Sequence, residues 1–282
     1  MNPVGSADSR LREACRVVIV NWNSGARLGR CLQSIPDQFE VVVVDNASAD
    51  LAAGELPASA LLLRNEANEG FAAAANRGAR GATREFLLFL NPDVEFAAPD
   101  SADSMLSLLC ARSAIAVATG RLLTTKPEQQ GSRTRGKPLI LPLPTLASAL
   151  ADILFLEELL GSPPQPDGRA ACRIEQAPGA CLLIRRSLFE AVGGFDPLFY
   201  PAWFEDVDLC KRLAGLGWEV WFQPRSLFRH EGGYSAGRLG QTEFNRIFYR
   251  NMVQYFRKHH GGGAAAVVRM AAVLGNVARR LR

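Results

Sequence analysis

R-V-V-I-V-N at Arg16–Asn21 and F-E-V-V-V-V at Phe39–Val44 are the two runs that decide the fold. Continuous β-branched residues, without the polar alternation of a half-exposed strand, are typical of strands that are buried on both faces. Between the two runs, residues 28–35 carry apolar side chains at the i, i+3, i+4, i+7 spacing of an amphipathic helix. A strand, a helix and a second buried strand in this order predict a parallel pair of strands.

The same rhythm continues along the chain. We expect further strands at Ala60–Leu63, Phe86–Leu90 and Ala114–Ala118, an alanine-rich helix at Gly70–Ala82 and another helix that opens at Pro99. Later elements are an apolar strand at Gly179–Arg186, a helix at Phe204–Ala214 and a helical tail from Gln241 that is interrupted at Gly261–Gly263. This order predicts an α/β fold with a Rossmann-like, mostly parallel sheet, flanking helices and a C-terminal helical tail.

The segment between about Thr124 and Ile174 differs from its neighbours. Gly131–Pro144 is rich in Gly, Pro, Arg and Lys, and Gly161–Gly168 holds three prolines. The residues between them, Thr145–Leu160, are expected to form an apolar helix. Such an interrupted segment is typical of a mobile excursion over a site, and we predict that it includes a loop that orders when ligands bind.

The composition excludes several classes of protein. Of the 282 residues, 48% are hydrophobic and 21% are charged, which argues against a disordered chain or a collagen-like repeat. The six cysteines are scattered without a C-x-x-C pair, which favours reduced thiols over a disulfide framework or a zinc site. The first fifteen residues are polar, and no apolar run reaches the roughly 18 residues that span a bilayer. We therefore expect a cytoplasmic protein that does not cross the membrane.

Positive charge is concentrated in the tail. From Arg238 to the end, nine Lys and Arg stand against one acid, Glu243, a net of +8, whereas the remainder of the chain carries −4. On a helix, five apolar tail residues share one narrow stripe: Val267, Met270, Leu274, Val277 and Leu281. This pattern predicts a basic amphipathic helix that lies on an anionic membrane, here the inner face of the cell membrane.

An alternative for the tail stays open, in which the stripe packs on the rest of the chain or on a second subunit, as in a homodimer. Nucleic acid is not expected as a partner, because the tail has no recognisable nucleic-acid-binding motif.

Two acids stand directly after predicted strands. Asp45 closes V-V-V-V-D and Asp93 closes F-L-L-F-L-N-P-D. In an open parallel sheet, ligands bind at the carboxyl ends of the strands, so both carboxylates are candidates for a site. The alternative is that each caps the helix or turn that follows it. No G-x-G-x-x-G follows the first strand, which argues against an NAD-dependent dehydrogenase.

Two other motifs are matched only in part. Gly131–Lys137 fits the first seven positions of a phosphate-binding loop, but Pro138 stands where a Ser or Thr is required. Gly233–Gly237 matches a hydrolase nucleophile elbow, but Glu243, the only later acid, is too close to complete a triad. We interpret neither motif as a site.

The densest cluster of candidate residues lies between Gly193 and His230. Glu205, Asp206 and Asp208 open a predicted helix, where the helix dipole by itself favours acids. Three aromatic residues stand just before these acids, namely Tyr200, Trp203 and Phe204. Aromatic neighbours indicate a carboxylate at the wall of a pocket, where desolvation raises its pKa toward that of a general base.

Eight short motifs run in order over about Arg16–Ser235. They are V-I-V-N-W-N (Val18–Asn23), V-V-D-N-A-S-A-D (Val43–Asp50), N-E-G-F-A-A-A-A-N-R-G (Asn68–Gly78), F-L-N-P-D-V (Phe89–Val94), G-A-C-L-L-I-R-R (Gly179–Arg186), G-G-F-D (Gly193–Asp196), F-E-D-V-D-L (Phe204–Leu209) and R-H-E-G-G-Y-S (Arg229–Ser235). Together they resemble the inverting family 2 nucleotide-sugar glycosyltransferases of the GT-A fold, and most closely their bacterial rhamnosyltransferase branch. The middle segment and the tail match only loosely.

The resemblance implies a site for a nucleotide-sugar donor. Asp45 would accept a hydrogen bond from the pyrimidine N3–H of the nucleotide. The other implied donor contacts are Asn21 and Asn46 near the base and Asn68, Gly70, Asn76 and Asn91 along the rest of the donor. At Gly70 the N-terminus of a helix would offer amides to phosphate oxygens.

The resemblance also implies a divalent metal, Mn²⁺ or Mg²⁺, held by Asp93 and His230. The family usually has Asp-x-Asp at this place, whereas Asn91-Pro92-Asp93 has a single carboxylate. One charged ligand predicts weak metal affinity until the donor diphosphate adds its own oxygens. The alternative for His230 is a core histidine with satisfied hydrogen bonds.

The implied reaction moves a sugar, L-rhamnose from dTDP-rhamnose, to a hydroxyl of a glycan or polyprenyl-linked acceptor in cell-surface polysaccharide synthesis, with inversion. Asp206 would act as the general base, and Glu205 and Asp208 would orient it or hold acceptor hydroxyls. Two alternatives stay open: another donor, such as UDP-galactofuranose or UDP-GlcNAc, and a sugar- or nucleotide-binding module that has lost the chemistry.

The resemblance divides the chain into a catalytic domain at residues 1–237 and the basic helical tail at 238–282. Within the domain we expect a nucleotide-binding half at about 16–120, the mobile segment at about 124–174 and an acceptor half at about 175–237.

Overall fold

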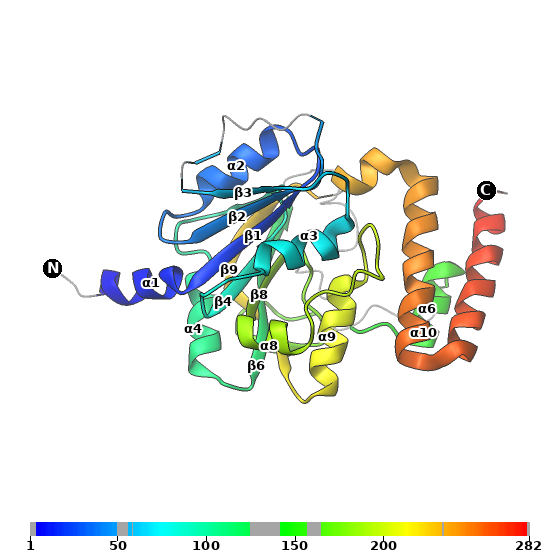
Figure 1. Ribbon diagram of the computed structural model, residues 1–282. Helices are drawn as coiled ribbons and strands as arrows, with labels where there is room; N and C mark the ends of the chain where they lie inside the picture. Colours follow the sequence, from blue (N-terminus) through cyan, green and yellow to red (C-terminus); the bar gives the residue numbers. More distant parts are fainter. Residues whose placement is uncertain are drawn as a thin grey trace.

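The computed structural model describes residues 4–49, 56–57, 59–124, 142–156, 165–232 and 234–280, with side chains from residue 8 onward and without those of 234–238 and 276–280. A twisted sheet lies between two layers of helices, and a group of helices that includes the C-terminal one stands beside it (Figure 1).

The first half of the sheet is parallel, as predicted. Its strands are β1 (Cys15–Asn21), β2 (Glu40–Asp45), β3 (Leu61–Arg64) and β4 (Phe86–Leu90). β1 pairs with β2 on one side and with β4 on the other, and β3 extends the sheet beyond β2. Every residue of β1 and β4 is buried, which confirms that these apolar runs form strands covered on both faces. The chain changes direction across the sheet between β1 and β4, and ligand sites of open sheets lie at such a point.

The second half of the sheet is mixed. Its strands are β8 (Cys181–Arg185), β6 (Ile115–Thr124), β9 (Glu219–His230), β5 (Val94–Phe96) and β7 (Cys172–Ile174). β8 runs antiparallel to β4 and β6, β6 is parallel to β9, and β5 and β7 are antiparallel to β9. The sequence pattern predicted β8 but not its direction, and it did not predict β9, the strand that carries His230.

Helices cover both faces of the sheet and form two apolar cores. On one face lie α1 (Val4–Glu13), α2 (Ala26–Ser34) and α4 (Asp103–Ala111), and on the other lie α3 (Gly70–Ala79), α8 (Arg186–Ala191) and α9 (Glu205–Gly215). α4 begins four residues later than predicted, because Pro99 belongs to a turn in which the Ala98 N–H donates to Ser101 Oγ at 2.9 Å.

A third core joins the tail to the middle of the chain. It is formed by α6 (Leu146–Ile153), the loop before α9 and α10 (Tyr234–Arg280), whose helical path is broken at Gly240 and Gly261. Thr145 caps α6, as its side chain accepts a hydrogen bond from the Ser148 N–H at 3.1 Å. Within the predicted excursion, α6 packs into this core, since Ala149 and Ile153 are buried against α10. Residues 125–141 and 157–164, with the predicted basic loop, lie outside the described part.

The cysteines and the possible membrane spans were the subject of two further expectations. None of the six cysteines forms a disulfide. Over the ranges that the structure covers, no helix combines the length and the apolar character that crossing a bilayer requires.

Candidate active site

Asn21 and Asp45 end two neighbouring parallel strands and are paired in register. The Asn21 Nδ2 donates to Asp45 Oδ1 at 2.9 Å and to Ser48 Oγ at 3.1 Å, and the Ser48 N–H donates to Asp45 Oδ2 at 3.2 Å. The structure therefore brings together two of the predicted base-binding residues, and Asp45 is completely buried.

The other amide atom of Asn21 is the open polar group of this corner. The Asp45 carboxylate only accepts hydrogen bonds, so the amide nitrogen of Asn21 faces it and Oδ1 faces away. Asn21 Oδ1 is buried and has no hydrogen-bond partner among the described residues. An unpaired buried acceptor costs about 1–3 kcal/mol, and a ligand N–H would remove that cost.

Arg64, which the sequence reasoning missed, stands over this pair. Its Nε lies 3.5 Å from Asp45 Oδ2, and its Nη2 donates to the Ser48 carbonyl at 3.1 Å. The Arg64 side chain is mostly exposed, whereas the Asp45 side chain that it contacts is completely buried. Asp45 and Arg64 are register partners in β2 and β3. The sequence could have indicated this contact, because an acid and a base stand at the ends of two adjacent predicted strands.

Asn46 connects the loop after β2 to the loop before α3. Its Oδ1 accepts from Asn65 Nδ2 at 2.8 Å and from the Glu69 N–H at 3.0 Å. Its Nδ2 donates to Asn68 Oδ1 at 2.8 Å and to the Gly70 carbonyl at 3.2 Å. The structure therefore uses Asn46 to hold the loop that carries Asn68 and Gly70, and both of its amide atoms are engaged there.

Gly70 is the point at which this loop meets the loop before α9. Its φ is +81°, and a Cβ there would lie 2.8 Å from Tyr200 Cδ2 and 2.9 Å from the Pro201 carbonyl oxygen. The Phe71 N–H donates to the same carbonyl at 2.6 Å, and the Tyr200 hydroxyl donates to the Asn68 carbonyl at 3.3 Å. Only glycine fits this position, and the contact brings the donor half against the acceptor half.

Asn76 connects α3 to the backbone of Phe195 in the G-G-F-D loop. Its Nδ2 donates to the Phe195 carbonyl at 2.7 Å, and its Oδ1 accepts from the Phe195 N–H at 2.9 Å. Both amide atoms thus hold the G-G-F-D loop against α3. Its polar atoms are used within the protein, and the donor contact implied for Asn76 stays a prediction.

Asp93 and His230 come together across the pair of strands β5 and β9. Val94 is the register partner of His230, and the His230 Nε2 lies 3.5 Å from Asp93 Oδ1. The Gly232 N–H donates to Asp93 Oδ2 at 3.2 Å. Burial raises the pKa of Asp93, but the hydrogen bond and charge of His230 outweigh burial, so the net pKa lies below its ordinary value.

The donor set of this pair fits a divalent metal of modest affinity. It offers carboxylate oxygen and imidazole nitrogen, which suit Mn²⁺, and carboxylate oxygen also suits Mg²⁺. Within the described residues, no group of three or more His, Cys, Asp or Glu side chains forms a metal cluster. The remaining positions around an ion would fall to the donor diphosphate and water, as the single carboxylate of Asn91-Pro92-Asp93 predicts.

Glu231, also missed from the sequence, anchors the end of β9. Arg27 on α2 donates to both of its carboxylate oxygens, from Nε at 2.8 Å and from Nη2 at 2.6 Å. The Glu231 N–H donates to the Asp93 carbonyl at 3.1 Å. This bidentate ion pair fixes the backbone next to His230.

Asp206 lies in the first turn of α9, and backbone N–H groups hold its carboxylate. Oδ2 accepts from Gly179 at 2.7 Å and Oδ1 accepts from Val207 at 2.8 Å. The next carbonyl after Gly179, that of Ala180, accepts from the Asn91 N–H at 3.0 Å. Two backbone contacts therefore connect Asp206 to the turn that carries Asp93. Burial raises the pKa of Asp206 above its ordinary value, although the backbone N–H groups lower it in part.

Glu205 is the more deeply buried neighbour, with 6% of its surface exposed. Its Oε2 has no hydrogen-bond partner among the residues that the structure describes. Burial raises its pKa well above the ordinary value, and the charge of Asp206 raises it further. Glu205 therefore has its pKa raised by burial and by its neighbour, and it lies directly beside Asp206.

Asp208 contacts Arg212 on its own helix and two residues of α10, and the expectation that it orients Asp206 or holds an acceptor stays a prediction. Its Oδ2 accepts from Arg212 Nε at 2.7 Å. Its Oδ1 lies 2.7 Å from Lys258 Nζ and 2.8 Å from His259 Nε2, both on α10. Asp208 is completely buried and joins α9 to the tail.

Of the three aromatic residues before the acids, two pack on α10 and one lies beside the loop that carries Asn68. Trp203 packs edge-on against Phe244 of α10 at 4.9 Å between ring centroids, and Phe204 packs on Phe248 at 5.2 Å. Tyr200 stays exposed beside the loop of Asn68. The predicted aromatic wall is thus mainly the contact surface of the tail.

The chain is similar to known glycosyltransferases over most of its length. The profile of Glycosyl transferase family 2 matches residues 16–193. An N-acetylglucosaminyl-diphospho-decaprenol L-rhamnosyltransferase of Mycobacterium tuberculosis is 30% identical over 247 residues, which cover 79% of this chain and 77% of that protein. A pre-mycofactocin glycosyltransferase of Mycobacterium tuberculosis is 28% identical over 223 residues, which cover 76% of this chain and 42% of that protein.

Solved structures agree at the level of the fold. A mannosyltransferase of Pyrobaculum calidifontis in complex with GDP-Man and Mn²⁺ superimposes with a TM-score of 0.58 at 18% identity, over 93% of this chain and 69% of that chain. GalNAc-T7 with UDP, GalNAc and Mn²⁺ gives a TM-score of 0.60 at 19% identity, over 86% of this chain and 47% of that chain. With the family profile and the rhamnosyltransferase relative, this fold shows that the chain belongs to family 2 of the glycosyltransferases.

Proposed function

We propose that this glycosyltransferase moves L-rhamnose from dTDP-rhamnose to a hydroxyl of a polyprenyl-linked glycan, with inversion at the anomeric carbon. The observation that carries the proposal is the position of Asp206, whose carboxylate is held by backbone amides and joined through Gly179 and Ala180 to the Asn91–Asp93 turn. The choice of sugar and acceptor is supported by the relative that is named a decaprenol-linked L-rhamnosyltransferase.

The chemical step needs one proton acceptor. Asp206 takes the proton of the acceptor hydroxyl while that oxygen forms a bond to the anomeric carbon and the bond from this carbon to the diphosphate oxygen breaks. A single displacement without a covalent intermediate inverts the configuration. Burial raises the pKa of Asp206, which makes its carboxylate a stronger base than an exposed one.

The leaving diphosphate is the second point at which charge develops. A divalent ion bound by Asp93 and His230 would supply Lewis acid stabilisation of the departing dTDP. The Gly232 N–H and the Arg27–Glu231 ion pair keep these two side chains in place. Asn91 would contact the donor from the same turn.

The nucleotide base would bind at the corner of Asn21 and Asp45. The resemblance implied that Asp45 accepts from the N3–H of the pyrimidine ring; we propose Asn21 Oδ1 for this contact, because it is the buried acceptor without a partner among the described residues. Asp45 would hold the amide of Asn21 in this orientation, at 2.9 Å. Thymine and uracil share this N–H, so UDP-galactofuranose and UDP-GlcNAc stay as alternative donors.

A polyprenyl-linked acceptor would require the enzyme to work at a membrane. We propose that it is a cytoplasmic protein attached peripherally to the inner face of the cell membrane through α10. A homodimer through the same helix is the competing arrangement.

A panel of nucleotide sugars tests the proposal. dTDP-rhamnose, UDP-galactofuranose, UDP-GlcNAc and GDP-mannose are compared for thermal stabilisation with Mn²⁺ present, and release of the nucleoside diphosphate is then followed with a polyprenyl-diphosphate-linked GlcNAc acceptor. We expect the largest stabilisation and acceptor-dependent release with dTDP-rhamnose. Another preferred donor would overturn the assignment of the sugar, and binding without turnover would favour a non-catalytic module.

A further inference from the structure

The last helical part of α10, residues 262–280, buries its small residues and exposes its large ones. Its inner face is Ala265, Val268, Ala271 and Ala272, all within the third core. Its outer face carries Met270, Val273 and Leu274, which are 62%, 60% and 58% exposed. A helix that only packs on its own domain buries its largest apolar side chains, so this arrangement indicates an outer partner.

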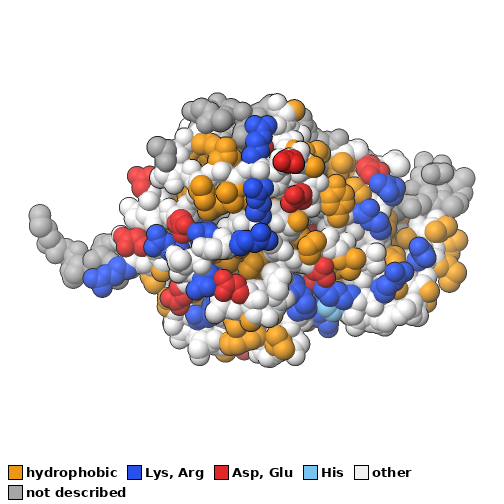
Figure 2. All heavy atoms as spheres, viewed as in Figure 1, with side chains coloured by type: hydrophobic (Ala, Val, Ile, Leu, Met, Phe, Trp, Pro, Cys, Tyr) orange, Lys and Arg blue, Asp and Glu red, His pale blue; other side chains and the backbone are white. Residues whose placement is uncertain are grey.

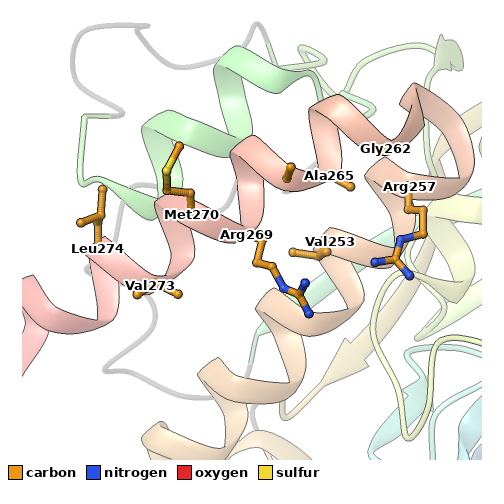
Figure 3. A pocket seen from close by; sticks show the side chains of 9 residues that line it. Val253, Arg257, Gly262, Ala265, Arg269, Met270, Val273 and Leu274 are labelled. Atoms are coloured by element: carbon orange, nitrogen blue, oxygen red, sulfur yellow. The ribbon is translucent and has the colours of Figure 1, made fainter.

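A groove lies along this outer face between the two long parts of α10 (Figure 3). It has a volume of about 420 Å³, and apolar side chains such as Val253 and Met270 line it. Two arginines, Arg257 and Arg269, are its charged lining residues, and Figure 3 shows their guanidinium groups on either side of Val253. Among the residues that the structure describes, no acid lines the groove.

These two arginines differ from the other cations of the helix. Arg246 pairs with Glu243 at 2.5 Å, Lys258 pairs with Asp208, and Arg250 donates to the Tyr200 carbonyl. Arg257 and Arg269 have no hydrogen-bond or ion-pair partner in the described part of the chain. Figure 2 shows hydrophobic side chains next to Lys and Arg side chains at the edge of the molecule where α10 lies.

The buried side of the same helical part contacts α6. A Cβ on Gly275 would lie 2.6 Å from the Ile153 carbonyl oxygen, so the two helices touch at this point. Leu154 and Leu156, which follow α6, are exposed. Each of the two contacting segments therefore carries exposed apolar side chains.

We propose that the face formed by Arg257, Arg269, Met270, Val273 and Leu274 docks on a bilayer that contains anionic phospholipid. The two guanidinium groups would bind lipid phosphates, and the three apolar side chains would enter the boundary between headgroups and acyl chains. This inference rests on the proposed function, because it places the active site beside a lipid-linked acceptor.

Charge complementarity favours lipid over a second copy of the chain. In a two-fold contact through this face, the arginines of both copies would approach one another, because such an interface uses the same patch twice. The described lining of the groove offers them no acid as a counter-charge. An anionic bilayer supplies phosphate at every position of the surface.

Vesicle flotation with the full chain tests the proposal. Vesicles of phosphatidylcholine alone are compared with vesicles that contain about one third phosphatidylglycerol. The double variant Arg257→Gln with Arg269→Gln removes the proposed phosphate contacts, and Met270→Gln with Leu274→Gln removes the apolar ones. The matched control, Arg169→Gln with Arg225→Gln, removes the same charge from two exposed arginines that do not line the groove.

We expect the wild type to float with the anionic vesicles only, and salt to weaken the binding. Loss of both groove arginines should lower the partition coefficient about thirtyfold, given the usual contribution of a cation near anionic lipid. The control should stay within about twofold of the wild type, and the Met270 and Leu274 variant should bind less at every salt concentration. Equal binding of wild type and groove variants would overturn the proposal, as would a dimer in analytical ultracentrifugation that the groove variants dissociate.

Donor binding separates this inference from the proposed function. Calorimetry with dTDP-rhamnose and Mn²⁺ in the absence of vesicles should give the same affinity for the wild type and the groove variants. Failure of the wild type to bind dTDP-rhamnose would contradict the proposed function and leave the vesicle result standing.

Discussion

Asp206 is the side chain on which the proposed chemistry depends. Asp206→Asn keeps the size and the hydrogen bond to Gly179 but removes the base, so kcat should fall by about 10²–10⁴ while donor affinity stays within a few-fold. Turnover assays and calorimetry measure the two quantities. A variant that keeps most of its kcat would contradict the assignment of the base.

The pH dependence of the same residue follows from its burial. The base must be ionised, and burial raises the pKa of Asp206, so kcat/KM should fall as the pH drops through that raised pKa and should be constant above it. This acid limb should lie at higher pH than the pKa of an exposed aspartate. A limb at the ordinary pKa would mean that the carboxylate is solvated in the free enzyme.

The titration of Glu205 should make the free energy of unfolding of the chain fall as the pH rises. Its pKa is raised in the folded chain, so it binds a proton on folding above the ordinary glutamate pKa, and the free energy of unfolding falls as the pH rises through the raised pKa. Glu205→Gln removes this titration. We expect the variant to gain stability relative to the wild type in urea unfolding at pH 8, with little gain at pH 4. A gain of equal size at both pH values would contradict a raised pKa at Glu205.

At the scale of elements, Asp208 connects α9 to α10. Asp208→Asn removes the buried negative charge beside Arg212 and Lys258 and weakens the contact to His259, and it should lower the free energy of unfolding by about 3 kcal/mol. Urea denaturation followed by fluorescence measures the change. Glu243→Gln is the control, because it removes the same charge from an exposed pair with Arg246 and should have no measurable effect. Equal stability of the two variants would show that the link carries no energy.

The contact of α6 with α10 depends on Gly275. A Cβ at this position would lie 2.6 Å from the backbone oxygen of Ile153, so Gly275→Ala should destabilise the chain by about 1–3 kcal/mol. Gly263→Ala is the matched control, since a Cβ there meets nothing within 4 Å and helical alanine is favoured over glycine by about 0.5–1 kcal/mol. Thermal unfolding should therefore separate the two variants in opposite directions, and a stabilising Gly275→Ala would contradict the close approach of the helices.

At the scale of the whole molecule, donor and metal should stabilise the fold together. dTDP-rhamnose at about 100 times its Kd, with Mn²⁺, should add about 2.7 kcal/mol to the free energy of unfolding. EDTA should remove most of this gain, because Asp93 and His230 would no longer hold the diphosphate through an ion. With Mn²⁺ present, the double variant Asp93→Asn with His230→Gln should gain only as much stability from dTDP-rhamnose as the wild type gains with EDTA. An equal shift in Tm with EDTA and with Mn²⁺ would exclude the metal role.

The tail is part of the folded core, which its sequence pattern did not predict. Its inner face completes the third core with Tyr255 and Phe256, and its outer face is exposed. Deletion after His260 would therefore unfold part of the core. For this reason point variants on the outer face, not a truncation, distinguish docking from folding.

The sequence alone determined the parallel half of the sheet and the corner that joins Asn21 to Asp45. Continuous apolar runs form buried strands wherever both faces are covered, so β1, β2 and β4 lie where their local pattern predicts. Parallel strands bring their carboxyl ends to one edge, which is why Asn21 and Asp45 could be placed together from their positions after those runs.

Tertiary structure alone decided which partners the polar side chains take. Asn76 bonds to Phe195, 119 residues away, and Asp208 pairs with Lys258 and His259, about 50 residues away. Local periodicity states which face of an element is apolar, but it contains no information on the direction of β8 or on which distant group meets a buried carboxylate. Those choices depend on how the elements pack, because a buried charge is stabilised by whichever counter-charge the whole fold brings within hydrogen-bond distance.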